Sequence, residues 1–178
     1  MANKSEVKQL VNVGIIAAFA TLAFIGTLVI RIPIPATGGY FNLGDTFVMI
    51  AALLYGPLVG GFVGLIGPAA ADAVGFPQFI LATAVVKGLE GLVVGIIGGK
   101  ARAGAYTKVV IALVLGIIIL VAGYYIFEAS IYPMLAKSIP FFGVTDAKAA
   151  LAEIVPNLLQ GALSAVIAFG IWRVFRRK

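Results

Sequence analysis

The stretch of sequence that decides the fold is residues 109–127, VVIALVLGIIILVAGYYIF, which contains no charged residue. A helix of about 20 apolar residues is long enough to cross the hydrocarbon core of a bilayer. Residues 154–172 are equally free of charge, and so is the chain between Lys8 and Arg31. These three segments predict membrane-spanning helices.

The composition supports an integral membrane protein. Of the 178 residues, 62% are hydrophobic and 11% are charged, whereas a soluble domain is about 45–50% apolar and about 25% charged. The chain has no Cys and no His, which excludes disulfides, thiolate catalysis, zinc sites and Ser-His-Asp chemistry. We therefore expect no enzyme, no metal site and no cofactor.

The net charge of +6 raises the question of an anionic partner. The basic residues flank apolar segments, which is typical of contact with membrane lipid and not with nucleic acid.

Three further spans are less uniform. Residues 78–99 are apolar apart from Lys87 and Glu90. Residues 43–75 are too long for one ordinary helix and short for two. Gly56-Pro57 is a turn signal near their middle, and proline is well placed to open a helix. We therefore predict two short helices that meet in a tight turn.

The fold class that follows is an all-α integral membrane protein, a six-transmembrane-helix bundle in one domain over residues 1–178. The predicted spans are about 10–30, 43–55, 57–75, 78–99, 107–128 and 151–173. With both termini cytoplasmic in the cell membrane, nine Lys and Arg residues fall inside and three fall outside, as the positive-inside rule favours.

Ionisable residues inside a membrane are costly and by default suggest function. Five of the seven acidic residues lie at or within the predicted spans, and most of the polar groups gather in the outer half. An apolar-walled pocket with a few placed polar groups suits a small ligand. The predicted substrate-binding residues are Asp45, Asp72, Lys87, Glu90, Asn157, Gln160, Tyr40, Phe41, Phe79, Tyr124, Glu128 and Glu153.

Each of these residues also has a structural interpretation. Lys87 and Glu90, three apart, could neutralise each other on one helix. Asp45, three residues after Asn42, could act in a helix cap, and Glu153 could complement a helix dipole. Glu128 could be interfacial, and the aromatic residues could form an interface belt.

Two predicted outer loops, 31–42 and 129–150, could form a lid over the pocket or could be plain connections. Glycines also recur every four residues in 56–64 and 91–99, and such small residues let helices pack closely within a bundle. Gly14 and Ala18 form a similar pair in the first span, where a face toward a partner protein is an equal alternative. No phosphate-binding Gly-x-x-x-x-Gly-Lys-Ser/Thr loop is present, so uphill transport would draw its energy from a partner.

Several short motifs lie close together in the chain: NLGD at 42–45, IAALLYGP at 50–57, Gly60-Gly61, GPAAAD at 67–72 and AVVKGLEG at 84–91. With these motifs the chain resembles the substrate-binding S components of energy-coupling factor (ECF) transporters. The span layout matches over about residues 10–175, and the chain is most similar to the riboflavin-type branch, which includes carriers of pyridoxine and hydroxymethylpyrimidine.

The resemblance implies a six-helix bundle that captures a vitamin from outside, beneath the first outer loop. It also implies docking through the first helices, including Gly14 and Ala18, on a membrane coupling subunit with two cytoplasmic ATPases. We expect a B-vitamin or precursor as ligand: pyridoxine, hydroxymethylpyrimidine or riboflavin, with a queuosine-type base also open. The alternatives are a stand-alone secondary transporter of a small heteroaromatic solute, or a channel subunit, and an intramembrane enzyme that uses carboxylates.

Overall fold

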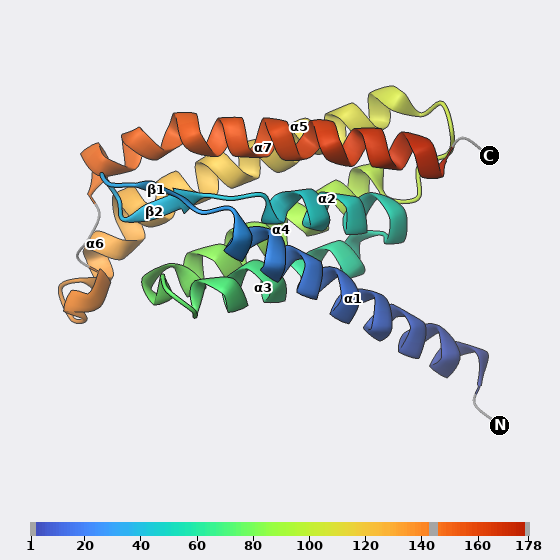
Figure 1. Ribbon diagram of the computed structural model, residues 1–178, viewed down its shortest axis with the longest axis horizontal. Helices are drawn as coiled ribbons and strands as arrows, with labels where there is room; N and C mark the ends of the chain where they lie inside the picture. Colours follow the sequence, from blue (N-terminus) through green and yellow to red (C-terminus); the bar gives the residue numbers. More distant parts are fainter. Residues whose placement is uncertain (1–2, 143–145, 177–178) are drawn as a thin grey trace.

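The computed structural model describes residues 3–142 and 146–176, which are mostly helical. Figure 1 shows an elongated bundle with both termini at one end and a small hairpin toward the other. The helices are α1 (Lys4–Val29), α2 (Gly44–Tyr55), α3 (Pro57–Asp72), α4 (Ile80–Gly98), α5 (Tyr106–Ile126), α6 (Tyr132–Leu135) and α7 (Ala147–Phe175). The strands are β1 (Ile32–Ile34) and β2 (Gly39–Phe41), and short turns of 3₁₀ helix, Pro77–Phe79 and Pro140–Phe142, precede α4 and α7.

Four helical stretches in the described part of the chain are long and apolar enough to cross a membrane: Ser5–Val29, Pro77–Gly98, Tyr106–Ala136 and Ala147–Phe175. Helices α2 and α3 have 12 and 16 residues, which makes them about 18 and 24 Å long. Each is shorter than the roughly 30 Å hydrocarbon core. Four of the six predicted spans are therefore supported by length, and the six-span count stays a prediction.

The turn predicted at Gly56-Pro57 is confirmed. Gly56 separates α2 from α3 and has a φ of +99°, a conformation that side chains disfavour and glycine adopts freely. Pro57 begins α3, where its missing N–H removes no helical hydrogen bond. The predicted close packing of glycines is confirmed too, because a Cβ at Gly60 would lie 2.7 Å from the Gly91 carbonyl oxygen on α4.

The hairpin was not predicted and departs from the all-α class. Residues 31–42, expected as a loop, contain β1 and β2 paired antiparallel, with Ile32 opposite Phe41 and Ile34 opposite Gly39. In Figure 1 the hairpin continues beyond the start of α2, toward the end of the bundle opposite the termini. The short α2 and the hairpin therefore lie one after the other along the bundle, and together they extend over a length that a single long helix covers elsewhere.

The helix of the fifth predicted span continues further than residue 128. Helix α5 continues beyond residue 128 through a turn of π-helix, Phe127–Ile131, into α6. Pro133, predicted to lie in a loop, is instead in the first turn of α6, where proline is tolerated. The predicted outer loop 129–150 is correspondingly shorter.

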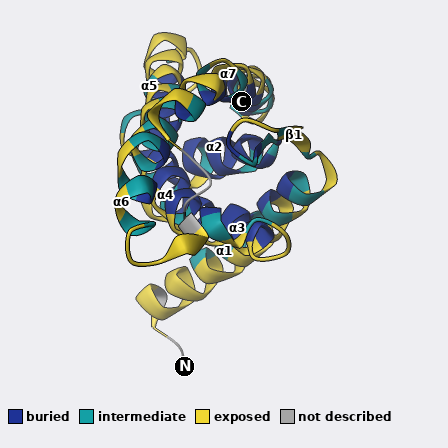
Figure 2. Cartoon of the chain, turned by 90° about the vertical axis from the view of Figure 1, so that its left-hand side faces the viewer, coloured by how far each residue is buried: buried dark blue, intermediate teal, exposed yellow. Residues whose placement is uncertain are grey.

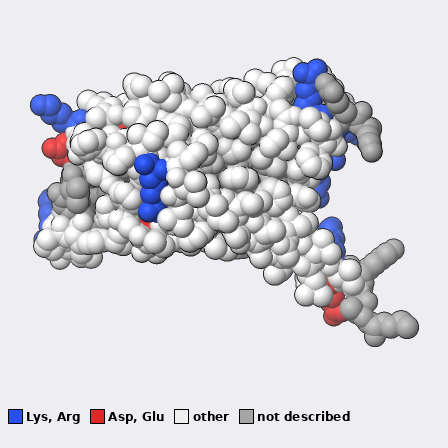
Figure 3. Space-filling view, in the orientation of Figure 1, with Lys and Arg blue, Asp and Glu red and all other residues white. Residues whose placement is uncertain are grey.

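The burial pattern is that of a protein in an apolar solvent. Many of the large apolar side chains on the outside of the bundle are exposed, for example Leu10, Ile96 and Val166, and Figure 2 shows the exposed residues on the outer faces of the helices. Figure 3 shows most of the visible Lys and Arg at the two ends, one basic side chain set in from one end, and the rest of the long side between them without charge. Such an uncharged band fits a bilayer.

The half of the bundle nearer the termini has an apolar core. Buried residues of α2, α4, α5 and α7, including Met49, Leu53, Leu113 and Trp172, form its largest hydrophobic cluster. Polar side chains are buried mainly in the other half, beneath the hairpin.

Candidate ligand-binding site

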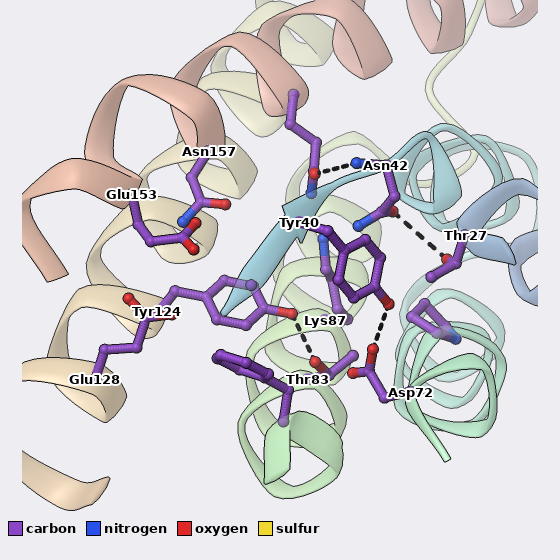
Figure 4. Close-up of a pocket in the computed structure, with 14 residues that line it drawn as sticks. Thr27, Tyr40, Asn42, Asp72, Thr83, Lys87, Tyr124, Glu128, Glu153 and Asn157 are labelled. Atoms are coloured by element: carbon purple, nitrogen blue, oxygen red, sulfur yellow. Dashed lines mark hydrogen bonds between the residues drawn. The ribbon is translucent and has the colours of Figure 1, made fainter. Parts of the chain in front are cut away.

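A small polar cavity lies beneath the hairpin, among α1, α3, α4, α5 and α7. Its volume is about 20 Å³, room for roughly one water molecule. Figure 4 shows its lining side chains converging from these elements. The lining residues are Thr27, Gly39, Tyr40, Asn42, Pro68, Asp72, Phe79, Thr83, Lys87, Tyr124, Glu128, Glu153, Asn157 and Gln160.

Nine of the twelve predicted site residues line this cavity, and the other three, Asp45, Glu90 and Phe41, do not. Asp45 lies directly behind the cavity, as described below. Glu90 is fully buried beside Asp45. Phe41 is paired with Ile32 in the hairpin. The convergence expected for the nine others is present, and their role in binding stays a prediction.

An ion pair forms the floor of the cavity. The Lys87 ammonium on α4 contacts the Asp45 carboxylate on α2, and both side chains are almost completely buried. The Gln160 Nε2 donates to Asp45 Oδ2 at 2.6 Å, and Gln160 Oε1 accepts from the Asn42 backbone N–H at 2.7 Å. Lys87 also lies 5.5 Å from the centre of the Tyr124 ring. This network fixes the position of the Lys87 ammonium at the cavity.

The network corrects two structural interpretations of the sequence. Lys87 pairs with Asp45 from another helix and not with Glu90, three residues away on its own helix. Asp45 makes no helix cap, because it is held by Lys87 and Gln160. Asn42 stabilises the first residue of α2 instead, because its Oδ1 accepts a hydrogen bond from the Gly44 N–H at 2.9 Å.

The hairpin forms the roof. The Tyr40 hydroxyl donates to Asp72 at the end of α3. The Tyr40 ring lies 4.3 Å from the Phe76 ring, centre to centre, and the Arg31 guanidinium lies 5.0 Å from Tyr40 and 5.1 Å from Phe76. Arg31 also donates to the Ala71 carbonyl at 2.6 Å. Burial, and secondarily the neighbouring Asp72 charge, raise the pKa of the Tyr40 hydroxyl above its usual range, so it remains a donor at neutral pH.

A second contact closes the hairpin on α7. The Thr37 hydroxyl, in the turn between the strands, donates to the Glu153 carboxylate. Glu153 lies in the second turn of α7 and is buried, whereas Asp146 caps that helix by accepting from the Ala149 N–H at 2.7 Å. The helix-dipole interpretation of Glu153 is therefore wrong.

The acidic side of the cavity combines two elements. Glu153 and Asn157 come from α7, and Glu128 comes from the π-helical turn after α5. Figure 4 shows all three on the same side of the cavity, with the Glu128 side chain pointing toward the α7 pair. Glu128 is 1% exposed, which rules out a merely interfacial position. Glu153, Asn157 and Gln160 are all buried on one face of α7, as their spacing predicted.

Sequence reasoning missed the hydroxyl groups. Thr27 and Thr83 line the cavity, and the Thr83 and Tyr124 hydroxyls are 2.7 Å apart. Thr37 lies behind the lining and bonds Glu153. Isolated threonines are common in apolar helices and do not by themselves indicate a site. Their position in the predicted spans, at the same depth as the predicted carboxylates, was the sequence feature that could have identified them.

The predicted docking pair lies away from the cavity. Gly14 and Ala18 are exposed on α1, the helix whose N-terminal part projects from the bundle (Figures 1 and 2). A Cβ built at Gly14 meets nothing within 4 Å. This surface is therefore not used for packing within the chain.

Comparison with known proteins shows that the fold has been seen before in a solved structure. A solved structure, described as "Structure and mechanism of the S component of a bacterial ECF transporter", superimposes with a TM-score of 0.70 over 94% of this chain and 96% of that chain, at 17% identity. An uncharacterised protein from a gap 3′ region of Pyrococcus woesei is 35% identical over 85% of this chain and 93% of its own length. A UPF0397 protein of Clostridium perfringens is 35% identical over 52% of this chain and 49% of its own length.

The family assignment rests on a match to nearly the whole chain. Residues 4–177 match the model of the family described as "ECF-type riboflavin transporter, S component". S components are transporter subunits that bind substrate, which agrees with the polar cavity in an apolar bundle. The chain belongs to the ECF-type riboflavin transporter S component family.

Proposed function

We propose that this protein captures a small vitamin or vitamin precursor from outside the cell and delivers it inward with a coupling subunit and two cytoplasmic ATPases. The observation that carries the proposal is the buried polar cavity beneath the hairpin. It combines aromatic walls with amide, hydroxyl and carboxylate groups, the usual make-up of a small-molecule site. Pyridoxine, hydroxymethylpyrimidine and riboflavin are the candidate ligands.

The orientation follows from charge. Both termini and the α4–α5 connection lie at one end of the bundle (Figure 1). Lys8, Lys100, Lys108 and Arg173 belong to these segments. The positive-inside rule makes this the cytoplasmic end, so the hairpin and the cavity lie on the outer side. An even number of crossings, six in this proposal, returns the chain to the cytoplasm.

The hairpin is the gate in this proposal. A cavity of about 20 Å³ is far smaller than the roughly 300–1,000 Å³ of ordinary ligand pockets. Ligand entry therefore requires a movement, and the hairpin is held over the cavity by contacts from Thr37 to Glu153, from Tyr40 to Asp72 and Phe76, and from Arg31 to the Ala71 carbonyl. These contacts are few enough to break and reform on binding.

The apolar half of the bundle supports dependence on a partner. Among the described residues, the core around Met49, Leu113 and Trp172 is hydrophobic, and the buried polar side chains of Glu90 and Ser164 give few steps for a polar path from the cavity to the cytoplasmic end. A stand-alone secondary transporter would need such a path through a fixed bundle. The protein is thus proposed to bind its ligand alone and to move it only in the assembled transporter.

Two measurements test this function. Calorimetry of the purified protein with pyridoxine, hydroxymethylpyrimidine and riboflavin should give saturable 1:1 binding to one of them. Liposomes that hold the protein alone should then show no uptake of that ligand, whereas liposomes that also hold the coupling subunit and ATPases should show ATP-dependent uptake. Uptake by the protein alone would support the secondary-transporter alternative and contradict the proposal.

A further inference from the structure

An apolar groove lies on the outside of the bundle between α5 and α7, which pack against each other along their length (Figure 1). Its volume is about 360 Å³, within the range of about 300–1,000 Å³ of ordinary ligand pockets. None of the described residues lines both this groove and the polar cavity, so the two are separate. Side chains of both helices line the groove, among them Val110, Val114 and Ile117 on α5 and Ala162, Val166 and Phe169 on α7.

Two side chains with polar groups continue the groove at one end. Tyr106 lies one helical turn before Val110 on α5, and Arg173 lies one turn after Phe169 on α7. The centres of the Tyr106 and Phe169 rings are 6.1 Å apart, and Arg173 Cζ lies 5.9 Å from the centre of the Tyr106 ring. Because residues four apart share a helix face, the groove and these two side chains form one strip that changes from apolar to basic.

The basic end of the strip belongs to a part of the molecule with an excess of positive charge. Residues 99–110 and 170–178 contain seven Lys and Arg residues and no Asp or Glu. Arg173 is exposed, and among the described side chains no carboxylate lies within 4 Å of its guanidinium. A guanidinium presents planar N–H donors that match the oxygens of a phosphate group. This end of the strip is therefore suited to a phosphate.

The walls of the groove suit an acyl chain better than a helix of another protein. Helices that associate within a membrane do so largely through small residues, which let their backbones approach. Apart from Ala162 and Ala165, the described lining consists of Val, Leu, Ile and Phe side chains. Residues 109–127 and 154–172 contain no charge, and several of the lining side chains are exposed. This surface therefore faces the hydrocarbon of the bilayer.

We propose that this strip binds one anionic phospholipid, with an acyl chain in the groove between α5 and α7 and the phosphate of its headgroup at Arg173, beside Tyr106. Charge complementarity selects the headgroup, and burial of apolar surface holds the chain. The site is independent of the proposed vitamin capture, because it lies on the lipid-facing surface and its basic end is at the end of the bundle opposite the hairpin (Figure 1).

Native mass spectrometry with defined lipids tests the proposal. The purified protein is titrated in detergent with dioleoyl phosphatidylglycerol, which is an anion, and with dioleoyl phosphatidylcholine, a zwitterion with the same acyl chains. We expect one phosphatidylglycerol per chain, bound about 5-fold more tightly than phosphatidylcholine, the effect of one basic side chain near a membrane surface. Glycerol phosphate, which is the headgroup without its chains, should not displace the lipid at the same concentration.

One pair of variants tests the headgroup contact. Arg173→Gln should remove the preference for phosphatidylglycerol over phosphatidylcholine. Lys108→Gln is the matched control, because Lys108 is exposed at the same end of the bundle but lies two residues from both Tyr106 and Val110, on a different side of α5. This control should keep the preference.

A second pair of variants tests the acyl chain. Ala162 is exposed and lines the groove, so Ala162→Phe should fill the groove and weaken binding of both lipids. The loss should be about 10-fold, which is the effect of about two methylene groups no longer buried. The matched control is Ala84→Phe, which fills a different apolar groove, of about 390 Å³, between α3 and α4. It should leave binding of both lipids unchanged.

Several results would overturn the proposal. Equal binding of the two lipids, or an equal loss in Arg173→Gln and Lys108→Gln, would mean a general attraction between a basic surface and anionic lipid. Displacement by glycerol phosphate would mean a phosphate site without a lipid, and full binding in Ala162→Phe would remove the acyl chain from the groove. A dimer that Ala162→Phe dissociates would assign the groove to a second copy of the chain. None of these results changes the capture function, which calorimetry with vitamins tests separately.

Discussion

The Thr37 hydroxyl donates a hydrogen bond to the Glu153 carboxylate, although the two residues are 116 positions apart in the chain. Thr37 lies in the turn of the hairpin, and Glu153 lies on α7 and lines the cavity. The contact therefore ties the roof of the site to one of its proposed ligand-binding groups. A ligand that engages Glu153 competes with or reshapes this contact, which couples binding to the position of the hairpin.

Thr37→Val should loosen the roof. Valine keeps the shape but removes the donor, which leaves a buried carboxylate oxygen without its partner, at a cost of about 1–3 kcal/mol. We expect a lower free energy of unfolding and faster ligand association and dissociation in stopped-flow measurements. Thr21→Val is the control, since the Thr21 hydroxyl bonds the Ala17 carbonyl of its own helix. Exchange rates equal to those of the wild type would contradict the proposed gate.

Tyr40→Phe should change how stability depends on pH. Because burial and Asp72 raise the pKa of Tyr40 in the folded state, the folded protein keeps this proton when the unfolded chain loses it near pH 10. The stabilisation is complete below that pH and is lost above it, by about 1.4 kcal/mol per pH unit. The difference in unfolding free energy between wild type and variant should therefore shrink above pH 10. Parallel curves over pH 8–11 would show that Tyr40 does not hold its proton in the fold.

Lys87→Met should be among the most destabilising single changes. It leaves the Asp45 carboxylate buried without its ammonium partner, and breaking a buried ion pair in this way costs about 3–5 kcal/mol. The double variant Asp45→Asn, Lys87→Met should recover most of that loss, because it removes both charges. Denaturant unfolding in detergent measures both effects, with Lys108→Met, an exposed lysine, as control. Additive losses in the double variant would mean that the pair is not coupled.

The helical part of the fold was predictable from the sequence, and the pairing of its polar groups was not. Charge-free runs located the long helices, and Gly56-Pro57 located the turn between α2 and α3. The spacing of Glu153, Asn157 and Gln160 predicted their shared buried face. The partner of Lys87 could not be predicted, because Asp45 and Glu90 both offer a carboxyl group and only the packing of α2 against α4 brings Asp45 to the ammonium.

The hairpin and the length of α5 were missed for similar reasons. Strands β1 and β2 have three residues each, too few for an alternating pattern to stand out. Glu128 suggested the end of a span, since a carboxylate there is costly in lipid. It is instead buried in a π-helical turn facing the cavity, so the helix continues past it. The cavity is almost closed because of the way its side chains pack, and no local sequence pattern predicts that packing.

Gly14→Leu should separate folding from assembly. Gly14 is exposed, and a Cβ there meets nothing within 4 Å, so the isolated protein should not lose stability and should gain up to about 1 kcal/mol, because leucine favours a helix more than glycine does. If α1 docks on the coupling subunit through Gly14 and Ala18, the larger side chain should weaken complex formation in pull-down and transport assays while ligand binding persists. Gly170→Leu on α7, another glycine with open space, is the control. Unchanged assembly with Gly14→Leu would contradict docking through this face.

The central claim is that the cavity beneath the hairpin captures a small solute, and native mass spectrometry of the purified protein tests it most directly. We expect one small molecule bound per chain, released and identified after unfolding, and absent or strongly reduced in Asn157→Ala. A protein that purifies empty, binds no member of a B-vitamin panel by calorimetry, and passes ions or solutes through liposomes without any ATPase would contradict the claim.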